Sequence, residues 1–333
     1  MQALSQFQTD LTQGSVFGQL LKFSVPFLLS NLLQALYNMA DMVIVGQFGG
    51  AVGASAVGIG GQVTILIINL ISGLAVGGTI MIAQFIGARR QKEVERTVGT
   101  MFTLYAIAGA AITVIMLLIN PWVLRLMQTP ADCYGEALAY LNICMGGTLF
   151  IVGYNAVSAV LRGMGDSRHP LIFVGVAAVV NIVLDLVFVG VFHMGAAGAA
   201  WATIAAQALS LVMSIVFLRR RDFVFDFHPR SFKMDKALAV QLVKLGIPAS
   251  LQGTLVSLSF MVLMTIANGV AGLTGSAALS IAGKVNSVAI LPSLAMQASV
   301  SSMAGQNIGA GKPERAKKTM FVAMGMSFVF SAL

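Results

Sequence analysis

Eight apolar stretches, each long enough to cross a lipid bilayer, dominate this sequence and constrain its fold. They lie near residues 20–46, 58–86, 97–119, 136–161, 171–192, 198–218, 245–268 and 277–306, and a ninth begins near residue 317. A stretch of about 20 apolar residues spans the hydrocarbon core as a helix. Only 10% of the residues are charged, whereas soluble domains carry about 25%. The sequence therefore predicts an all-α integral membrane protein.

The basic residues follow a pattern that predicts how these spans are oriented. They gather after the second, fourth, sixth and eighth spans, and the other connections carry almost none apart from Arg125. By the positive-inside rule, the N-terminus and the even-numbered connections are expected in the cytoplasm. The net charge of +8 then reflects topology and does not indicate nucleic acid. We expect a multi-pass protein of the cell (plasma) membrane, with membrane lipid as a partner. The basic residues are Arg89, Arg90, Lys92, Arg96, Arg162, Arg168, Arg219, Arg220, Arg221, Arg230, Lys233, Lys236, Lys312, Arg315, Lys317 and Lys318.

The chain matches itself without gaps when it is shifted by 222 residues. The segment 19–22 then meets 241–244, Pro26 meets Pro248, and 84–88 meets 306–310. Shared membrane composition would align scattered Leu, Val and Ala, but not Pro, Gln and paired Gly in one register. Because six spans fall within one period, both copies enter the membrane in the same orientation. A parallel repeat of this kind is typical of two-lobed transporters.

The repeat divides the chain into four expected parts. Residues 1–18 form an N-terminal cytoplasmic or interfacial segment, 19–218 a six-helix lobe, 219–240 a cytoplasmic linker, and 241–333 the first part of a second lobe. Two complete parallel six-helix repeats would give twelve spans, and about eight and a half are present. We therefore expect the C-terminal lobe to be truncated in this sequence.

Two carboxylates lie inside predicted spans, Asp41 in the first and Asp185 in the fifth. A charge at mid-bilayer depth costs several kcal/mol unless it faces a cavity or a partner, so such residues are functional candidates. Two acids that lie close together cannot both stay ionised without a cation, and they would bind a proton or a sodium ion as a pair. Competition between that ion and a cationic substrate is sufficient for antiport. A purely structural polar network is the alternative.

Four predicted spans each present a polar face, which must contact protein or water because lipid offers no hydrogen bonds. On the first span the polar residues follow the spacing of three and four that marks one side of a helix. The simplest closed arrangement directs all four faces to one wet cavity. Single amides and hydroxyls often only join helices, so the hypothesis rests on the two acids. The residues are Asn31, Gln34, Tyr37, Asn38 and Asp41, then Asn155 and Ser158, then Asn181 and Asp185, then Thr203 and Gln207.

Pro26 and its repeat mate Pro248 have two interpretations. Each proline either permits a kink in its helix or marks the first helical turn, where it costs little. A bend at Pro26 would re-aim the polar stripe that carries Asp41. In the second copy, Leu263 stands where the first has Asp41, so the copies do not share the same ion chemistry. Lys284 lies inside the eighth span, where it would pair with an acid, contact substrate or extend its charge to the membrane surface.

The sequence does not predict an enzyme. Residues 163–166 spell GxGD, as in intramembrane aspartyl proteases, but that chemistry needs two acids at mid-membrane depth that share a proton. Asp166 instead lies in a polar connection before Pro170, which is typical of a turn. The two cysteines, Cys133 and Cys144, form neither a disulfide framework nor a metal set. No cofactor is expected beyond H+ or Na+ as a coupling ion.

Four segments carry a family resemblance: LLKFSVPFLLSNLLQALYNMADMVIVGQFGG from residue 20, QFIGARRQKE from 84, LRGMGDSRHP from 161 and QNIGAGKPERA from 306. Together with the twin repeats, they resemble the multidrug and toxic compound extrusion (MATE) transporters, and the resemblance runs along the whole chain from Gln19. Asp41 in the first span and NIVLD at 181–185 resemble the DinF-like branch. That branch gathers its cation site in the first lobe.

The resemblance implies cation-coupled antiport by alternating access, with multidrug efflux or xenobiotic transport of amphipathic, often cationic, small molecules or drugs. By position it makes Asp41, Asn181, Asp185 and Thr203 the coupling-ion residues, for H+ or for Na+ as a bound metal ion. It makes Gln34, Tyr37, Asn155 and Ser158 cavity residues. We expect Asn38 and Lys284 to line the same cavity, Pro26 to act as a hinge, and the protein to be a monomer.

A flippase of lipid-linked oligosaccharides or other lipids, from the same wider superfamily, is the alternative function. Such a protein is expected to line its cavity with several basic residues for a pyrophosphate group. Only Lys284 meets that requirement in this sequence, which favours the antiporter.

Overall fold

The computed structural model describes residues 9–220 and 223–332, and all regular elements in these ranges are helical. The first, α1 (Val16–Gly87), begins where Ser15 accepts a hydrogen bond from the N–H of Gly18 at 3.3 Å. It is broken at Gly50, whose φ of 64° and ψ of −166° suit glycine and almost no other residue. The two arms of α1, residues 16–49 and 51–87, contain the first two predicted spans. The all-α prediction is confirmed.

The other helices of the first repeat follow the predicted spans closely. They are α2 (Gln91–Leu126), α3 (Ala131–Gly146), α4 (Thr148–Gly163), α5 (Arg168–Asp185), the π-helix η2 (Leu186–Val191) and α6 (Gly195–Arg219). The predicted fourth span is bent by 48° between α3 and α4. At this bend a Cβ on Gly147 would lie 2.3 Å from Ile204 of α6, so only glycine lets α6 approach this closely.

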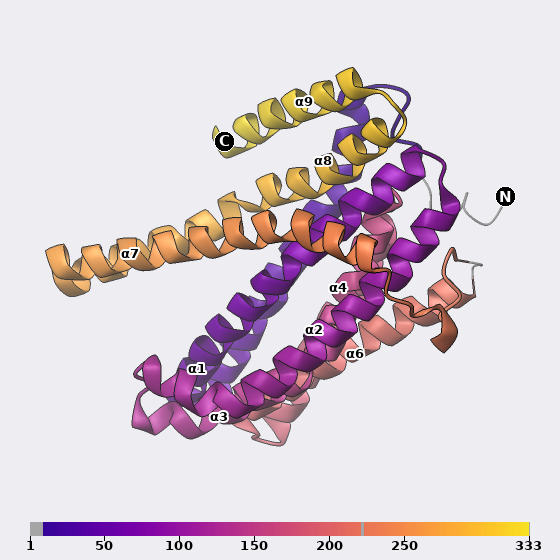
Figure 1. Cartoon of the computed structure of the whole chain (residues 1–333). Helices are drawn as coiled ribbons and strands as arrows, with labels where there is room; N and C mark the ends of the chain where they lie inside the picture. The colour runs from indigo at the N-terminus through magenta and orange to yellow at the C-terminus, as the bar shows by residue number, and fades with distance from the viewer. Residues whose placement is uncertain (1–8, 221–222, 333) are drawn as a thin grey trace.

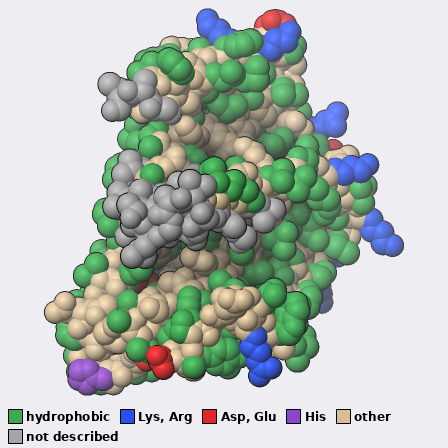
Figure 2. Space-filling model, turned by 90° about the vertical axis from the view of Figure 1, so that its left-hand side faces the viewer, with side chains coloured by type: hydrophobic (Ala, Val, Ile, Leu, Met, Phe, Trp, Pro, Cys, Tyr) green, Lys and Arg blue, Asp and Glu red, His purple; other side chains and the backbone are tan. Residues whose placement is uncertain are grey.

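In the part of the chain that the structure describes, α1, α2, α5 with η2, and α6 are long and apolar enough to cross a membrane, and the bent α3–α4 pair makes a fifth candidate. Figure 2 shows that hydrophobic side chains cover much of the visible face. Large ones are strongly exposed, including Leu118 at 76%, Phe328 at 76% and Trp122 at 64%. Apolar side chains are stable in such positions where the solvent is lipid.

The second repeat differs from the prediction at one boundary. After the short helix η3 (Pro229–Ser231), it comprises α7 (Lys236–Ala289), α8 (Leu291–Gly309) and α9 (Pro313–Ala332). The expected break between residues 268 and 277 is wrong, because α7 continues to Ala289 and only Ile290 separates it from α8. Pro292 then lies in the first turn of α8, where a proline costs no helical hydrogen bond.

Pro26 and Pro248 lie inside α1 and α7, well after these helices begin. The first-turn interpretation is therefore wrong for both. The helices begin earlier than the apolar stretches suggest, because their first turns contain polar residues. Since proline has no N–H, the carbonyl of Lys22 has no helical donor at Pro26.

The helices diverge from one end of the molecule, where the N-terminal segment meets the turns after α1, α4 and α8 (Figure 1). We call this end, comprising residues 9–15, 84–91, 164–167 and 306–312, the basic end. Three hydrogen bonds join its parts: Thr9 N to Met164 O at 3.4 Å, Leu11 N to Gln306 Oε1 at 3.0 Å, and Lys312 Nζ to Thr12 O at 2.9 Å. From here α7 extends away from the lower part of α1 and α2 (Figure 1).

The two repeats pack against each other at the basic end through a reciprocal pair of glycine contacts. A Cβ on Gly87 would lie 2.0 Å from the carbonyl oxygen of Gln306, and a Cβ on Gly309 would lie 1.9 Å from that of Gln84. Gln84 and Gly87 are the repeat mates of Gln306 and Gly309. The contact therefore repeats itself across a pseudo-twofold axis, as parallel repeats require, and small residues let the backbones meet.

The connection between the repeats packs against the start of α2. Phe225 is 1% exposed, and its ring centroid lies 5.5 Å from that of Phe102. Asp235 forms an ion pair with Arg96 of α2 and accepts hydrogen bonds from the N–H groups of Ala237 at 2.9 Å and Leu238 at 3.3 Å. The aromatic side chains and this carboxylate thus anchor the start of α7 to the first repeat.

The hydrogen bond from Leu238 N–H, followed by that from Ala237 and the charge of Arg96, holds the pKa of Asp235 below its ordinary value despite its partial burial. A lowered folded-state pKa adds stability above the unfolded pKa and loses it as the pH falls through the folded pKa. We expect Asp235→Asn to lower the melting temperature at pH 7, and the difference to shrink toward about pH 3. Thermal unfolding in detergent at pH 7 and at about pH 3 measures the difference in melting temperature between the variant and the unaltered chain. A difference that is the same at both pH values would contradict the assignment.

Candidate cation site

Three helices bring together four residues that the sequence predicts as ligands of a coupling ion. Thr203 of α6 donates a hydrogen bond from Oγ1 to Asp41 Oδ2 of α1 at 3.4 Å, and Asn181 Nδ2 of α5 donates to Thr203 Oγ1 at 3.5 Å. The carboxyl group of Asp185 lies against that of Asp41. Asp41, Asn181 and Asp185 are 6%, 2% and 0% exposed. The two acids predicted to meet inside the first repeat do meet there.

Local structure places Asp185 at a change of helix type. It is the last residue of α5, and the chain continues as the π-helix η2. Single π-helical turns widen a helix and are frequent at functional sites. Opposite this turn, α6 begins with small residues, and a Cβ on Gly198 would lie 3.2 Å from Phe188. This close approach lets Thr203, further along α6, reach Asp41.

Several acceptor oxygens in this cluster have no hydrogen-bond donor among the described residues. They are Asp41 Oδ1, Asn181 Oδ1, both carboxylate oxygens of Asp185 and the nearby Gln207 Oε1. Buried polar groups are nearly always paired, and one left unpaired costs about 1–3 kcal/mol. A proton or a hard cation would satisfy several of these oxygens at once, since such ions prefer oxygen ligands. The residues therefore fit a small cation.

The donor set is unlike that of a transition-metal centre. In the ranges that the structure describes, no three His, Cys, Asp or Glu side chains gather around a common point. The cluster instead combines two carboxylates with amides and a hydroxyl. Cys133 and Cys144 are both buried and both free.

The cluster continues into residues that the sequence reasoning missed. The side chains of Tyr140 and Cys144, one helical turn apart on α3, interact with each other, and Cys144 also interacts with Thr64 of α1. A Cβ on Gly60 would lie 2.5 Å from the Tyr140 ring. The spacing of four between Tyr140 and Cys144 is a signal that could have indicated a shared polar face.

The other predicted site residues are distributed unevenly. Gln34 and Tyr37 are half-buried, whereas Asn38 is exposed. The side chain of Tyr37 interacts with that of Gln207. Ser158 is buried beside Tyr154. Lys284 lies outside the residues whose side chains the structure describes.

Asn155, which the sequence predicts as a cavity residue, lies outside the cluster around Asp41 and Asp185. Its side chain donates to the carbonyl of Ile151 at 2.8 Å, and it lines a separate small pocket with Ile71 and Tyr105. Its amide is thus partly satisfied by its own helix, and its role in a substrate cavity stays a prediction. Pro26 lies in the interior of α1, where its carbonyl accepts a hydrogen bond from Ser30 Oγ at 2.9 Å.

The sequence is similar to one protein family along most of its length. The sequence model of the MatE family matches residues 26–187 and 248–333. The probable multidrug resistance protein YpnP of Bacillus subtilis is 32% identical over 308 residues, which cover 92% of this chain and 68% of that protein. YoeA of the same organism, also named a probable multidrug resistance protein, is 32% identical over 329 residues, covering 97% and 71%.

Solved structures agree with the described arrangement of helices. An outward-facing multidrug resistance MATE transporter of the MOP superfamily superposes with a TM-score of 0.91 at 27% identity, covering 97% of this chain and 72% of that one. A MOP superfamily transporter from Pyrococcus furiosus gives a TM-score of 0.90 at 27% identity, with the same coverage. A MATE structure in a bent conformation gives 0.90 at 27% identity, covering 99% and 72%.

Proposed function

The chain belongs to the MatE family of multidrug efflux transporters, and from this we propose that it exports amphipathic, often cationic, small molecules across the plasma membrane in exchange for H+ or Na+. The observation that carries the proposal is the buried pair of acids, Asp41 and Asp185, with its unpaired oxygens. The names of the relatives, probable multidrug resistance proteins, support the substrate class.

The chemistry of the site supports coupling between ion and substrate. Two adjacent carboxylates in a poorly solvated interior cannot both hold a negative charge without a nearby cation. A bound ion would neutralise the pair. Thr203, which donates to Asp41, and Asn181, which donates to Thr203, would hold the acids in place. A cationic substrate that reaches the same acids displaces the ion. This assignment corresponds to the DinF-like arrangement, with the ion in the first repeat.

The packing of the repeats supports alternating access. The basic end is closed by the glycine contacts, and the helices diverge from it (Figure 1). We assign this arrangement to an outward-facing state with the basic end in the cytoplasm. Relatives have been solved in bent and in straight conformations, with TM-scores of 0.90 and 0.89. Pro26 is our candidate for the hinge, because it removes one hydrogen bond from the interior of α1.

Dye efflux from proteoliposomes under separate pH and sodium gradients identifies the coupling ion, and one gradient is expected to drive transport.

Thr203→Val removes the hydroxyl that donates a hydrogen bond to Asp41. It should raise the ion concentration needed for half-maximal efflux about fivefold, the value of one ordinary hydrogen bond. The matched control is Thr103→Val, since Thr103 only donates to Gly99 of its own helix. An unchanged ion dependence in Thr203→Val would remove Thr203 from the site.

A further inference from the structure

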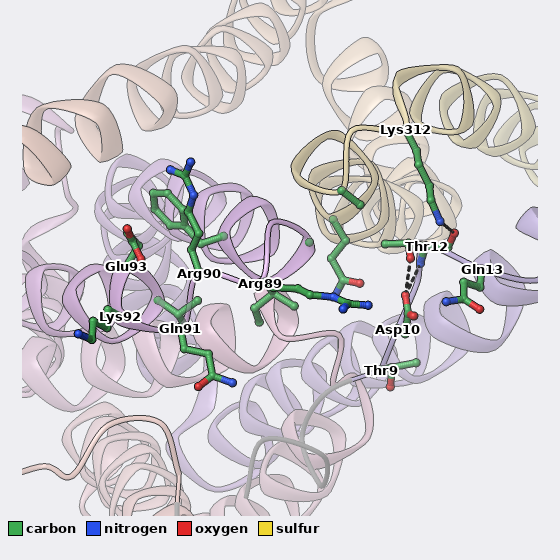
Figure 3. Close-up of a pocket in the computed structure, with 16 residues that line it drawn as sticks. Thr9, Asp10, Thr12, Gln13, Arg89, Arg90, Gln91, Lys92, Glu93 and Lys312 are labelled. Atoms are coloured by element: carbon green, nitrogen blue, oxygen red, sulfur yellow. Dashed lines mark hydrogen bonds between the residues drawn. The ribbon is translucent and has the colours of Figure 1, made fainter. Parts of the chain in front are cut away.

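A second polar site lies at the basic end of the molecule, apart from the cation site. It is a pocket of about 980 Å³ formed by residues of the segments 9–13, 85–94 and 306–312. Figure 3 shows the side chains that surround it. The N-terminal segment, the first repeat and the second repeat thus each contribute part of the wall.

The charge of this pocket is predominantly positive. Arg89, Arg90, Lys92 and Lys312 line it, against the two acids Asp10 and Glu93. Asp10 Oδ1 already accepts hydrogen bonds from Thr12 N at 2.8 Å and Thr12 Oγ1 at 2.7 Å. Arg89, Arg90 and Lys92 take part in none of the ion pairs found among the described residues. The pocket therefore offers more positive charge than its own acids neutralise.

A buried amide in the same wall lacks an acceptor. Gln306 is 1% exposed, and its Oε1 accepts a hydrogen bond from Leu11 N at 3.0 Å. Its Nε2 has no hydrogen-bond partner among the described residues. The first turn of α2, which has no side-chain cap, lines the pocket as well. Unpaired donors, guanidinium groups and a helix N-terminus are what a phosphate group requires.

The backbone of Arg89 provides an independent observation. Its φ is 58°, in the left-handed region, and its N–H closes the turn after α1 by donating to Ile86 O at 2.9 Å. The repeat mate, Gly311, closes the equivalent turn with a φ of 70° and a bond to Ile308 O at 3.0 Å. Glycine is the residue that this position favours. Figure 3 shows the Arg89 side chain extending toward Asp10, so the strained position directs a cation across the pocket.

We propose that this pocket binds a phosphate group, supplied either by the headgroup of an anionic lipid or by a soluble phosphate compound. Arg89 and the Gln306 amide are the donors. Because the wall includes both repeats, the bound anion joins them and stabilises the closed basic end. Binding itself does not depend on the transport that we propose, so the two ideas can fail separately.

The test compares the chain with Arg89→Gly and with Lys318→Gln. Arg89→Gly removes the guanidinium but gives the turn the residue found in the second repeat, so the variant is expected to fold at least as well. Lys318 is an exposed cation of α9 outside the pocket and serves as the matched control. In uncharged detergent, calorimetry measures the binding of inorganic pyrophosphate. In nanodiscs, thermal unfolding compares phosphatidylcholine alone with phosphatidylcholine containing phosphatidylglycerol.

We expect Arg89→Gly to weaken the response to the anion about tenfold or more, as the loss of a charge-assisted contact implies, and Lys318→Gln to respond within about twofold of the unaltered chain. Binding of pyrophosphate identifies a soluble ligand, and stabilisation by phosphatidylglycerol alone identifies a lipid. The proposal is overturned if the unaltered chain responds to neither probe, or if Arg89→Gly responds as strongly as the unaltered chain.

Discussion

Asp41→Asn is expected to reduce gradient-driven efflux about tenfold or more, and Asp185→Asn to have the same effect. Asparagine keeps the size of the side chain but cannot hold the charge that balances the coupling ion. Each acid is buried, and the two lie against each other, so loss of one leaves the other without its partner. Interactions with a charged group contribute about 1.5–3 kcal/mol each, which predicts a loss of about tenfold or more in coupled transport.

Efflux of a cationic dye from proteoliposomes measures this effect, with expression and melting temperature followed in parallel. Asp132→Asn is the matched control, because Asp132 is an exposed acid in the first turn of α3. Its efflux should stay within about twofold of the unaltered chain. If both Asp41→Asn and Asp185→Asn retained full coupled efflux, the acids would be a structural network. Downhill ion current without coupling would instead favour a channel.

Gly87→Ala and Gly309→Ala are expected to force the two repeats apart at the basic end. In each case the new Cβ would lie at about 2 Å from a backbone oxygen of the other repeat, a distance that no rotamer change relieves. Overpacking of this kind costs about 1–3 kcal/mol. The closed state should therefore lose population, and efflux should fall about tenfold.

Pulsed electron paramagnetic resonance between spin labels at positions 92 and 318 measures the separation, in a background without Cys133 and Cys144. Longer distances are expected for both glycine variants. Gly61→Ala, in the same arm of α1, is the matched control because a Cβ there meets nothing within 4 Å. Unchanged label distances together with normal efflux in Gly87→Ala would show that the repeats do not meet at this glycine.

The sequence predicted those features that depend on local patterns. Apolar length gave the helices, and the spacing of polar residues placed Asp41 and Asn181 on inward faces. The meeting of Asp41 with Asp185 followed from the energetic cost of a lone charge in lipid. The bend at Gly147 could not be predicted, because its cause is Ile204 on a distant helix. The polar face that carries Asn155 showed its direction, but not that its amide donates to a carbonyl of its own helix.

The boundary between α7 and α8 at Ile290 was missed for a related reason. Apolar composition continues through residues 277–306, and composition does not show where a continuous helix is interrupted. The repeat gave a better guide to packing than to boundaries. It aligned Gly87 with Gly309, and these two glycines lie at equivalent places in the interface, against the carbonyls of Gln306 and Gln84.

The reciprocal glycine contact also has a mechanical consequence. It lies at one end of the second arm of α1, which runs from residue 51 to residue 87, and an α-helix of that length extends over about 55 Å. The contact thus lies near one end of a long helical arm and can act as its pivot. A tilt of about 5° at the contact would displace the far end of the arm, near residue 51, by roughly 4–5 Å over such a length. Atoms beside the contact would hardly move. A small tilt at this contact therefore produces a large displacement at the far end of the arm without repacking the contact itself.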